Sequence, residues 1–209
     1  YSKSWEGKNN TILINDVRYS PAGVLAPIQR SDLAFTMHML YHLSETGTCA
    51  IVEFPGVLYR GGAEKKIREY LIKNNFVDTV IQLPANLFFG VGIATCIIVI
   101  KKNKKDNNIL FVDASGECEK KGDKNKLEDK NQNRIVNAYQ ERKEEQYFTK
   151  LVSNDEVLAN GANLSVSSYV EKEDKREVID IVALNEEIEA LSKDVRNRSV
   201  ELDEMIKEL

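Results

Sequence analysis

The chain has 209 residues, of which 42% are apolar, and 29 basic and 33 acidic residues give it a formal net charge of −4. This is enough for one domain with a core, or for a smaller domain with an appendage. Free-standing nucleic-acid binders usually carry a basic excess, so any nucleic-acid contact must come from a local patch or from partner chains. No apolar run reaches the roughly 18 residues of a membrane span, and no signal peptide is recognisable. We therefore expect a cytoplasmic protein that does not contact a membrane.

Cysteine and histidine do not form a metal-binding pattern. Cys49, Cys96 and Cys118 are far apart, so we expect free thiols in a reducing compartment and no metal site. His38 and His42 lie one helical turn apart, which is the spacing of half a metal site. No third ligand stands near them, and an ordinary helix surface or partial burial is the alternative.

The expected elements alternate between helices and apolar strands. Residues 1–30 have little periodicity and predict a long ordered loop, which is usually functional in a compact domain. Periodicity then predicts a helix opened by Ser31 and closed by Gly47, a strand over 49–54, a helix over 63–74, and strands over 76–83, 93–100 and 109–112. This alternation indicates α/β architecture with a covered, largely parallel sheet. The two strands without an intervening helix, 76–83 and 93–100, indicate one antiparallel element.

The composition changes after about residue 115. Residues 119–134 are dominated by Lys, Asp, Glu, Asn and Gln, which predicts a solvated loop. A helix near 127–145, a small helix at 154–159, a strand at 163–169 and a charged linker at 171–178 follow in the prediction.

The C-terminal tail has the most regular pattern in the sequence. Apolar residues recur at alternating steps of three and four, and only Arg198 interrupts them. This predicts a coiled-coil seam, with a helix that lies on its own domain as the alternative. The seam consists of Ile181, Leu184, Ile188, Leu191, Val195, Arg198, Leu202, Met205 and Leu209. We expect partner binding through Ile181, Leu184, Ile188, Leu191, Val195 and Leu202, and self-association of the isolated chain through the same helix.

Five strings occur in order and at ordinary spacing. They are Pro21 to Pro27, Asp32 to Phe35, Phe54 to Glu64, Ile81 to Gly90 running on to Ala94 to Cys96, and Asn163 to Ser167. Through these strings, residues 1 to about 205 resemble the second half of the modification (M) subunit of type I restriction-modification systems. That family consists of N6-adenine DNA methyltransferases.

The resemblance implies the late part of a Rossmann-like S-adenosylmethionine-dependent methyltransferase sheet, followed by a small mixed region and a C-terminal coiled-coil helix. The corresponding division is 1–114 for the catalytic part, 115–178 for the mixed region with a charged loop and linker, and 179–209 for the helix. It also implies methylation of adenine N6 with S-adenosylmethionine, and three partners: DNA, a specificity subunit and a motor-nuclease restriction subunit. The alternative is a non-enzymatic assembly module that pairs through its C-terminal helix.

The family's catalytic signature is Asn-Pro-Pro followed by Tyr or Phe, and Tyr1-Ser2 resembles its end. The resemblance gives Tyr1 the role of stacking on a flipped adenine, and a frayed terminal residue is the alternative. The Asn, both prolines and the family's Gly-rich cofactor turn are absent from this sequence. We therefore expect this chain alone to be inactive.

Two further segments are candidates for contacts with the base or the DNA. Phe88, Phe89 and Gly90 match the position of the family's second base-stacking group, and the alternative is that both rings anchor the loop in the core. Arg60 with Gly61-Gly62 stands between a strand end and a helix, where exposed amides could receive a phosphate; a plain turn is the alternative.

Two lysine runs are less specific signals. Residues 101–105 and 120–126 either follow a DNA backbone or form solvated loop faces, because neighbouring acidic residues dilute their charge.

Overall fold

The computed structural model describes residues 3–173 and 180–207. The chain separates into two units, Tyr1–Lys172 and Glu173–Leu209, and each is described by itself. Tyr1, most of the predicted charged linker and the seam position Leu209 lie outside the described residues.

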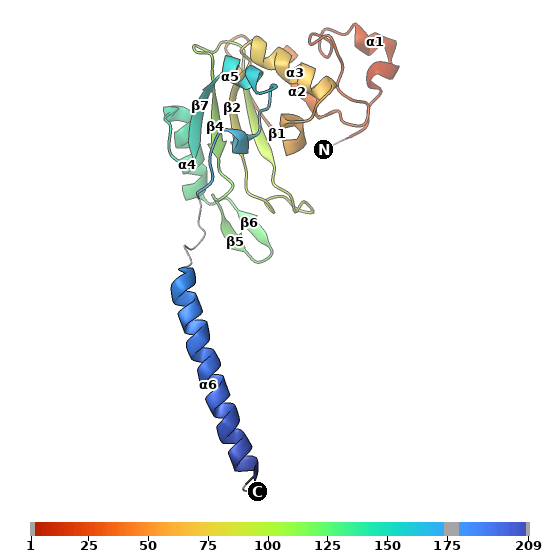
Figure 1. The fold of residues 1–209 in the computed structure, drawn as a ribbon. Coiled ribbons are helices and arrows are strands. Elements are labelled where there is room, and N and C mark those ends of the chain that lie inside the picture. Colours follow the sequence, from red (N-terminus) through yellow and green to blue (C-terminus); the bar gives the residue numbers. More distant parts are fainter. Residues whose placement is uncertain (1–2, 174–179, 208–209) are drawn as a thin grey trace. The chain divides into compact units, whose positions relative to one another are not determined.

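The first unit is built on a five-stranded sheet with the strand order β1-β3-β2-β4-β7 (Figure 1). The strands are β1 (Thr48–Glu53), β2 (Val77–Gln82), β3 (Cys96–Lys101), β4 (Asn108–Asp113) and β7 (Thr149–Ser153). The antiparallel pairing of β2 with β3 confirms the element expected there.

The prediction of a largely parallel sheet is wrong, because β2 and β4 form the one parallel pair among the described strands. The physical reason is the position of β3. It returns from β2 through a loop instead of a helix and inserts between β1 and β2, so that two strands of like direction are separated by one of opposite direction. An apolar run shows that a strand is covered but does not show its direction.

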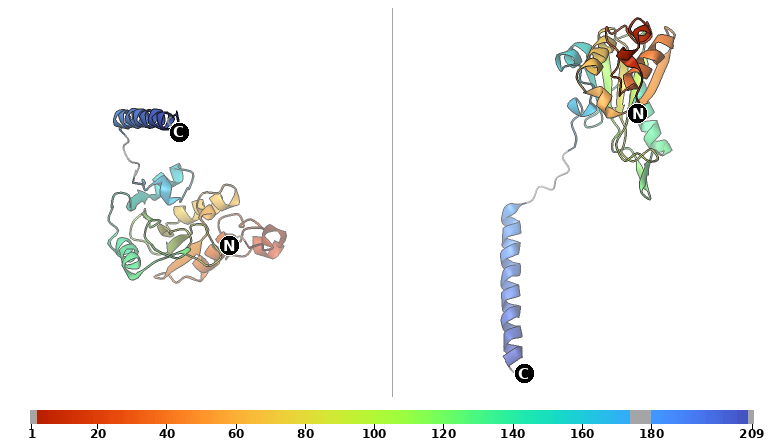
Figure 2. Two further views of the ribbon diagram at one scale, coloured as in Figure 1. Left: turned by 90° about the horizontal axis from the view of Figure 1, so that it is seen from below. Right: turned by 90° about the vertical axis from the view of Figure 1, so that its right-hand side faces the viewer.

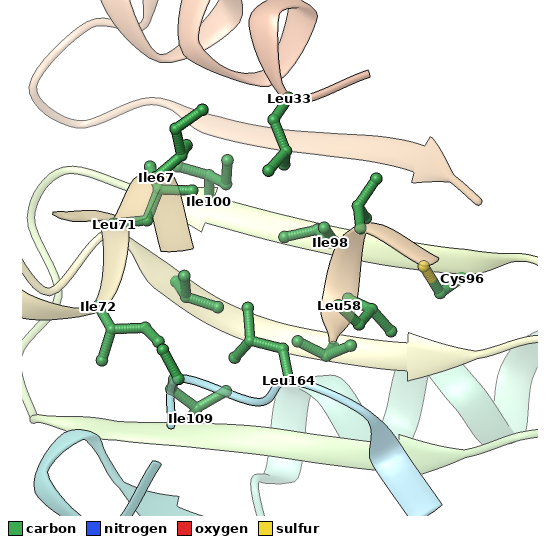
Figure 3. Close-up of a cluster of buried hydrophobic side chains, with 14 of the residues drawn as sticks. Leu33, Leu58, Ile67, Leu71, Ile72, Cys96, Ile98, Ile100, Ile109 and Leu164 are labelled. Carbon is green, nitrogen blue, oxygen red and sulfur yellow. The ribbon is translucent and has the colours of Figure 1, made fainter. Parts of the chain in front are cut away.

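Helices cover both faces of the central strands. On one face lie α2 (Asp32–His42), α3 (Ala63–Lys73) and α5 (Asn154–Ala159), and on the other lies α4 (Asp129–Glu141). Figure 3 shows the first core, where side chains of α2 and α3 gather over Ile98 and Ile100 of β3. Ile81, Leu110 and Ile135 belong to the second core. Because both faces are buried, the inner positions of β3 and β4 are continuously apolar.

Residues 3–30 form an ordered loop that contains two short turns, Gly7–Asn9 and α1 (Thr11–Ile14). Trp5 fastens this segment, since its backbone N–H donates to Ile28 O at 2.8 Å and its indole N–H donates to Pro27 O at 3.0 Å. Tyr19 packs edge-on against Trp5, and its hydroxyl lies 3.3 Å from His38 Nδ1. Within the described ranges, no group of three or more potential ligands could hold a metal ion.

Part of the predicted solvated loop is a hairpin of β5 (Glu119–Lys121) and β6 (Lys124–Lys126). Charged residues gave no apolar alternation to reveal it, and its signal is the two-residue connection in which Gly122 has a φ of +60°. The helix α4 is shorter than predicted. It begins at a capping box of Glu128 and Asn131 and ends where Arg142 adopts a left-handed φ of 50°.

The predicted strand at 163–169 is wrong, because this segment contains a 3-10 turn over Val166–Ser168. The side chain of Asn163 accepts from the backbone N–H of Ser165 at 2.9 Å and donates to Ser168 Oγ at 3.0 Å. Such local bonds from a side chain offer the backbone an alternative to a strand ladder.

The second unit is the single helix α6 (Ile181–Lys207), which Figure 2 shows as one continuous element. Asp180 caps it, since its carboxylate accepts from the backbone N–H groups of Val182 and Ala183 at 2.9 and 3.1 Å. In the part of the chain that the structure describes, no helix is long and apolar enough to cross a membrane.

Candidate functional site

The residues at the carboxyl ends of three strands lie side by side at one end of the sheet. The register pairs Glu53 with Cys96, Cys96 with Gln82, and Gln82 with Asp113, so these four residues form a row. This row is the carboxyl end of β1, β2 and β4, from which three loops leave the sheet (Figure 1). Ligands of α/β proteins bind beyond such an edge.

Glu53 is the buried carboxyl of this row, with 2% of its surface exposed. Burial raises its pKa to about 7, and the nearby charge of Asp32 acts in the same direction. A hydrogen bond of 3.0 Å from Thr36 Oγ1 favours the charged form and opposes this shift. The Cys96 thiol donates to Glu53 O, and burial raises the pKa of this thiol to about 12. Glu53 therefore exchanges its proton near neutral pH, whereas Cys96 stays an unreactive thiol.

Arg60 stands at the turn that leads into α3. Its Nη1 lies 3.5 Å from Glu64 Oε1, and its guanidinium lies 5.4 Å from the ring centroid of Phe54. A Cβ on Gly56 would lie 2.4 Å from the Arg60 guanidinium carbon, so a larger residue there would displace the Arg60 side chain. Gly62 has a φ of +67°, which favours glycine. The charge of Arg60 is thus shared with a buried carboxylate.

The loop between β2 and β3, residues 84–93, carries the predicted aromatic pair and is called the aromatic loop below. Phe89 is 100% exposed and Phe88 is 38% exposed, so neither ring belongs to the cores that hold the sheet. The base of the loop is closed by Leu83 N–H and Gln82 Nε2, which both donate to Thr95 O. The loop therefore presents aromatic surface from a fixed base.

The lysine run at 101–105 lies at the other end of the strands, where it contacts the start of β2. Lys101 Nζ lies 3.3 Å from Asp78 Oδ2, and Lys104 Nζ donates to Val77 O at 2.7 Å. Burial lowers the pKa of Lys104 to about 8. Because β3 runs antiparallel to β2, its lysine-rich end lies away from the aromatic loop.

Sequence reasoning missed two residues of this region, Glu53 and Asn125. An acidic residue that ends an apolar strand was the available signal for Glu53. Asn125 gave no signal, because its hydrogen bonds to the aromatic loop span 40 residues of sequence.

Comparison with known proteins identifies the family. The sequence profile described as N-6 DNA Methylase matches residues 1–178. The chain belongs to this family. A type I restriction enzyme MpnII methylase subunit from Mycoplasma pneumoniae is 44% identical over 99% of this chain and 39% of its own length. The MjaVII methylase subunit from Methanocaldococcus jannaschii is 33% identical over 88% of this chain and 32% of its own length.

A solved structure agrees with this assignment. The methyltransferase subunit of a type I restriction-modification system from Streptococcus thermophilus matches with a TM-score of 0.79 and 41% identity, over 82% of this chain and 36% of that chain. The resemblance to type I M subunits is thereby confirmed, and the chain spans less than half the length of these relatives. The non-enzymatic assembly module is not favoured, because the match to methylase subunits runs across the whole sheet unit.

Proposed function

We propose that this chain forms part of a type I restriction-modification DNA methyltransferase, which methylates adenine N6 with S-adenosylmethionine in the cytoplasm. The main support for this proposal is the 44% identity to a methylase subunit over 99% of the chain. Because the chain spans 39% of that relative, the activity is proposed for the assembled enzyme, together with a specificity subunit, a motor-nuclease restriction subunit and DNA as partners.

In this proposal the sheet is the late part of a Rossmann-like methyltransferase sheet. The position of β1 supports it, since β1 ends the described sheet and its residues Ala50 and Val52 are exposed. An exposed strand edge with apolar residues suits a place inside a larger sheet. The proposed functional division stays at residues 1–114, 115–178 and 179–209.

The residues of this chain do not by themselves suit S-adenosylmethionine. The strand-to-helix turn with adjacent glycines is Gly61-Gly62, and the side chains beside it, Arg60 and Glu64, form an ion pair with each other. We therefore assign no residue of this chain to the cofactor, whose use in the family enters the proposal for the assembled enzyme only.

The chemistry explains what this chain supplies. The exocyclic amine of adenine is a poor nucleophile because its lone pair is delocalised into the ring, so the base must be extruded, held flat and hydrogen-bonded at the amine. We assign the stacking surface to Phe89, with Phe88 beside it and Gly90 at a φ of +71° shaping the turn. Tyr1 is proposed as a second stacking ring, and Arg60 as a positive charge near a phosphate.

The C-terminal helix is proposed as the contact with the specificity subunit, through pairing of helices in a coiled coil. Its seam residues are exposed, from 44% at Leu184 to 69% at Ile181. An exposed apolar stripe at heptad spacing, here interrupted at Arg198, is the surface that a partner helix covers. The residues concerned are Ile181, Leu184, Ile188, Leu191, Val195 and Leu202.

Methyl transfer by the complete methylase, with its specificity subunit, tests the proposal. Labelled S-adenosylmethionine and mixed-sequence DNA should yield N6-methyladenine on nucleoside digestion, whereas this chain alone should incorporate no label above background. Methylation of cytosine, or no methylation by the assembled enzyme, would contradict the assignment. Methylation by the isolated chain would contradict the expected inactivity.

A further inference from the structure

The β5–β6 hairpin is fastened to the aromatic loop at three points. The backbone N–H of Asn125 donates to Asn86 O at 3.1 Å, and its side-chain amide donates to Ala85 O at 2.9 Å. Lys124 Nζ donates to Phe88 O at 3.4 Å. Asn86 has a left-handed φ of 55°, so the backbone of Asn125 bonds to a loop residue in a sparsely populated conformation. Figure 1 shows this hairpin beside the loops that leave the same edge of the sheet.

The hairpin also brings positive charge to the loop. The register places Lys120 directly opposite Asn125, so both side chains share the face that meets the loop. Lys121 is paired with Glu128 at 2.9 Å. By contrast, Lys120 and Lys124 form no ion pair with an acidic side chain within the described ranges. Two ammonium groups outside ion pairs therefore lie on the hairpin that is hydrogen-bonded to the loop with the exposed Phe89 ring.

We propose that the hairpin and the aromatic loop form one DNA-binding unit, in which Asn125 is a positioning residue for the loop and Lys120 and Lys124 bind backbone phosphates beside the base that stacks on Phe89. This inference rests on the proposed function, which supplies the DNA. An aromatic platform next to lysines is the arrangement that binds unstacked nucleotides, since the ring contacts the base and the ammonium groups contact the strand. Lys124 has two further N–H groups to donate beyond its bond to the loop.

The lysine part is tested by DNA affinity at several salt concentrations, with the complete methylase and its specificity subunit. Each phosphate contact contributes about 0.9 to the slope of log affinity against log salt. Lys120→Ala and Lys124→Ala should each lower the slope by about that amount and weaken binding about fivefold at ~0.15 M salt. Lys124→Arg should restore the slope. The matched control is Lys73→Ala, an exposed lysine at the end of α3, which should change neither quantity.

The positioning part is tested with 2-aminopurine in place of the target adenine, because its fluorescence rises when the base leaves the stack. Asn125→Ala removes the side-chain bond and keeps the backbone bond. We expect about a tenfold loss of kcat and of the fluorescence change, because a displaced stacking group no longer holds the base in place. The KM for DNA and the melting temperature should stay unchanged, and Asn125→Gln should recover part of the signal. Asn133→Ala, an exposed asparagine on α4, is the control.

The outcomes separate the two proposals. If Phe89→Ala keeps normal turnover and fluorescence, the stacking assignment in the proposed function fails. If Phe89→Ala lowers both, while the lysine variants keep the salt slope and Asn125→Ala keeps the fluorescence change, the hairpin inference alone is overturned. A loss of activity in Asn125→Ala that only follows a fall in melting temperature also overturns it.

Discussion

At the scale of single residues, the two neighbouring phenylalanines of the aromatic loop differ in exposure. Phe89 is fully exposed and Phe88 is 38% exposed, so truncation of Phe89 removes no buried contact. In the complete enzyme, Phe89→Ala should lower turnover by the contribution of one stacked base, about 1–3 kcal/mol, which is a factor of about 5 to 160. Its melting temperature should stay within about 2 °C of the parent's, since exposed substitutions change stability little.

The comparison for this prediction is Phe88→Ala, which should cost less turnover, and Tyr147→Ala, a partly exposed aromatic residue outside the aromatic loop, which should cost none. Steady-state methylation and thermal unfolding supply the two measurements. A lower melting temperature of Phe89→Ala with normal turnover would show that the ring supports the fold instead of the base.

Glu53 gives a prediction for stability against pH. Its pKa in the folded chain is about 7, above the ordinary 4.5, so the folded state holds a proton that the unfolded state releases between these values. This contribution to stability is fully present below about pH 4.5 and is lost as the pH rises through about 7. It amounts to at most about 3 kcal/mol. Glu53→Gln mimics the neutral acid, so its stability should fall less between pH 5 and pH 8.

Urea denaturation of the parent chain and of Glu53→Gln at pH 5 and pH 8 measures the effect of Glu53. Equal losses of unfolding free energy in the two variants would show that Glu53 does not titrate in this range. The sequence could not have supplied this prediction, because the burial of Glu53 and its bond to Thr36 depend on how α2 packs against β1. The aromatic pair could be proposed from the sequence because it lies inside a string typical of the family.

At the scale of elements, the apolar runs predicted the existence of the central strands but not their order, and the missing helix between β2 and β3 gave the direction of that pair alone. Val80 and Ile81 face different cores, so the pattern of β2 reports two covered faces and nothing about its neighbours. The β5–β6 hairpin was missed for the opposite reason, since its charged residues meet solvent and Gly122 makes the turn. Elements held by local side-chain bonds, such as Asn163 to Ser168, were also misjudged.

One buried cation joins three elements and gives the element-scale prediction. Arg68 of α3 is 2% exposed, and its guanidinium donates to Val57 O at 2.9 Å and to Ala162 O at 2.7 Å. Arg68→Met fills similar volume but leaves these carbonyls without their donors. Leaving a buried carbonyl without a donor costs about 1–3 kcal/mol, so the loss of both bonds should lower the unfolding free energy by about 2–5 kcal/mol. Lys66→Met, on the exposed side of the same helix, should change the unfolding free energy by less than about 0.5 kcal/mol.

Chemical denaturation of the two variants decides this point. A loss below about 1 kcal/mol in Arg68→Met would show that water or a shifted backbone satisfies both carbonyls. The segment after α5 would then be held by its apolar residues, such as Leu164 and Val166, which are 1% exposed.

At the scale of the whole molecule, the chain divides into a sheet unit and a helix unit, and the helix pattern was fully readable in the sequence. Heptad spacing depends only on local periodicity, which is why α6 was predicted with nearly its observed bounds, Ile181–Lys207. The partner of that helix was not readable, because the same stripe suits a helix of another chain, a second copy or the chain's own domain.

The association of the chain gives the last prediction. The seam positions of α6 are exposed by about half or more, for example 52% at Ile188, 58% at Leu191 and 66% at Val195. Covering this stripe stabilises by about 25 cal/mol per Å² of apolar area, so the isolated chain should pair with a second copy through its tails. Arg198 occupies a seam position and bonds to Asp194 of its own helix at 2.9 Å. A charged residue at the seam lowers the stability of pairing, so the dimer should be weak.

Sedimentation velocity on the full chain and on a variant without residues 179–209 separates tail pairing from association through the edge of β1. A dimer that forms at tens of micromolar and is lost in the shortened variant is the expected result. Arg198→Leu, which completes the apolar stripe, should tighten the dimer because it removes a charge from the seam and adds apolar area to it. A dimer that persists without the tail would assign the contact to the exposed edge of the sheet. A full chain that stays monomeric at high micromolar concentration would contradict the prediction, and would mean that the helix covers its seam on its own domain.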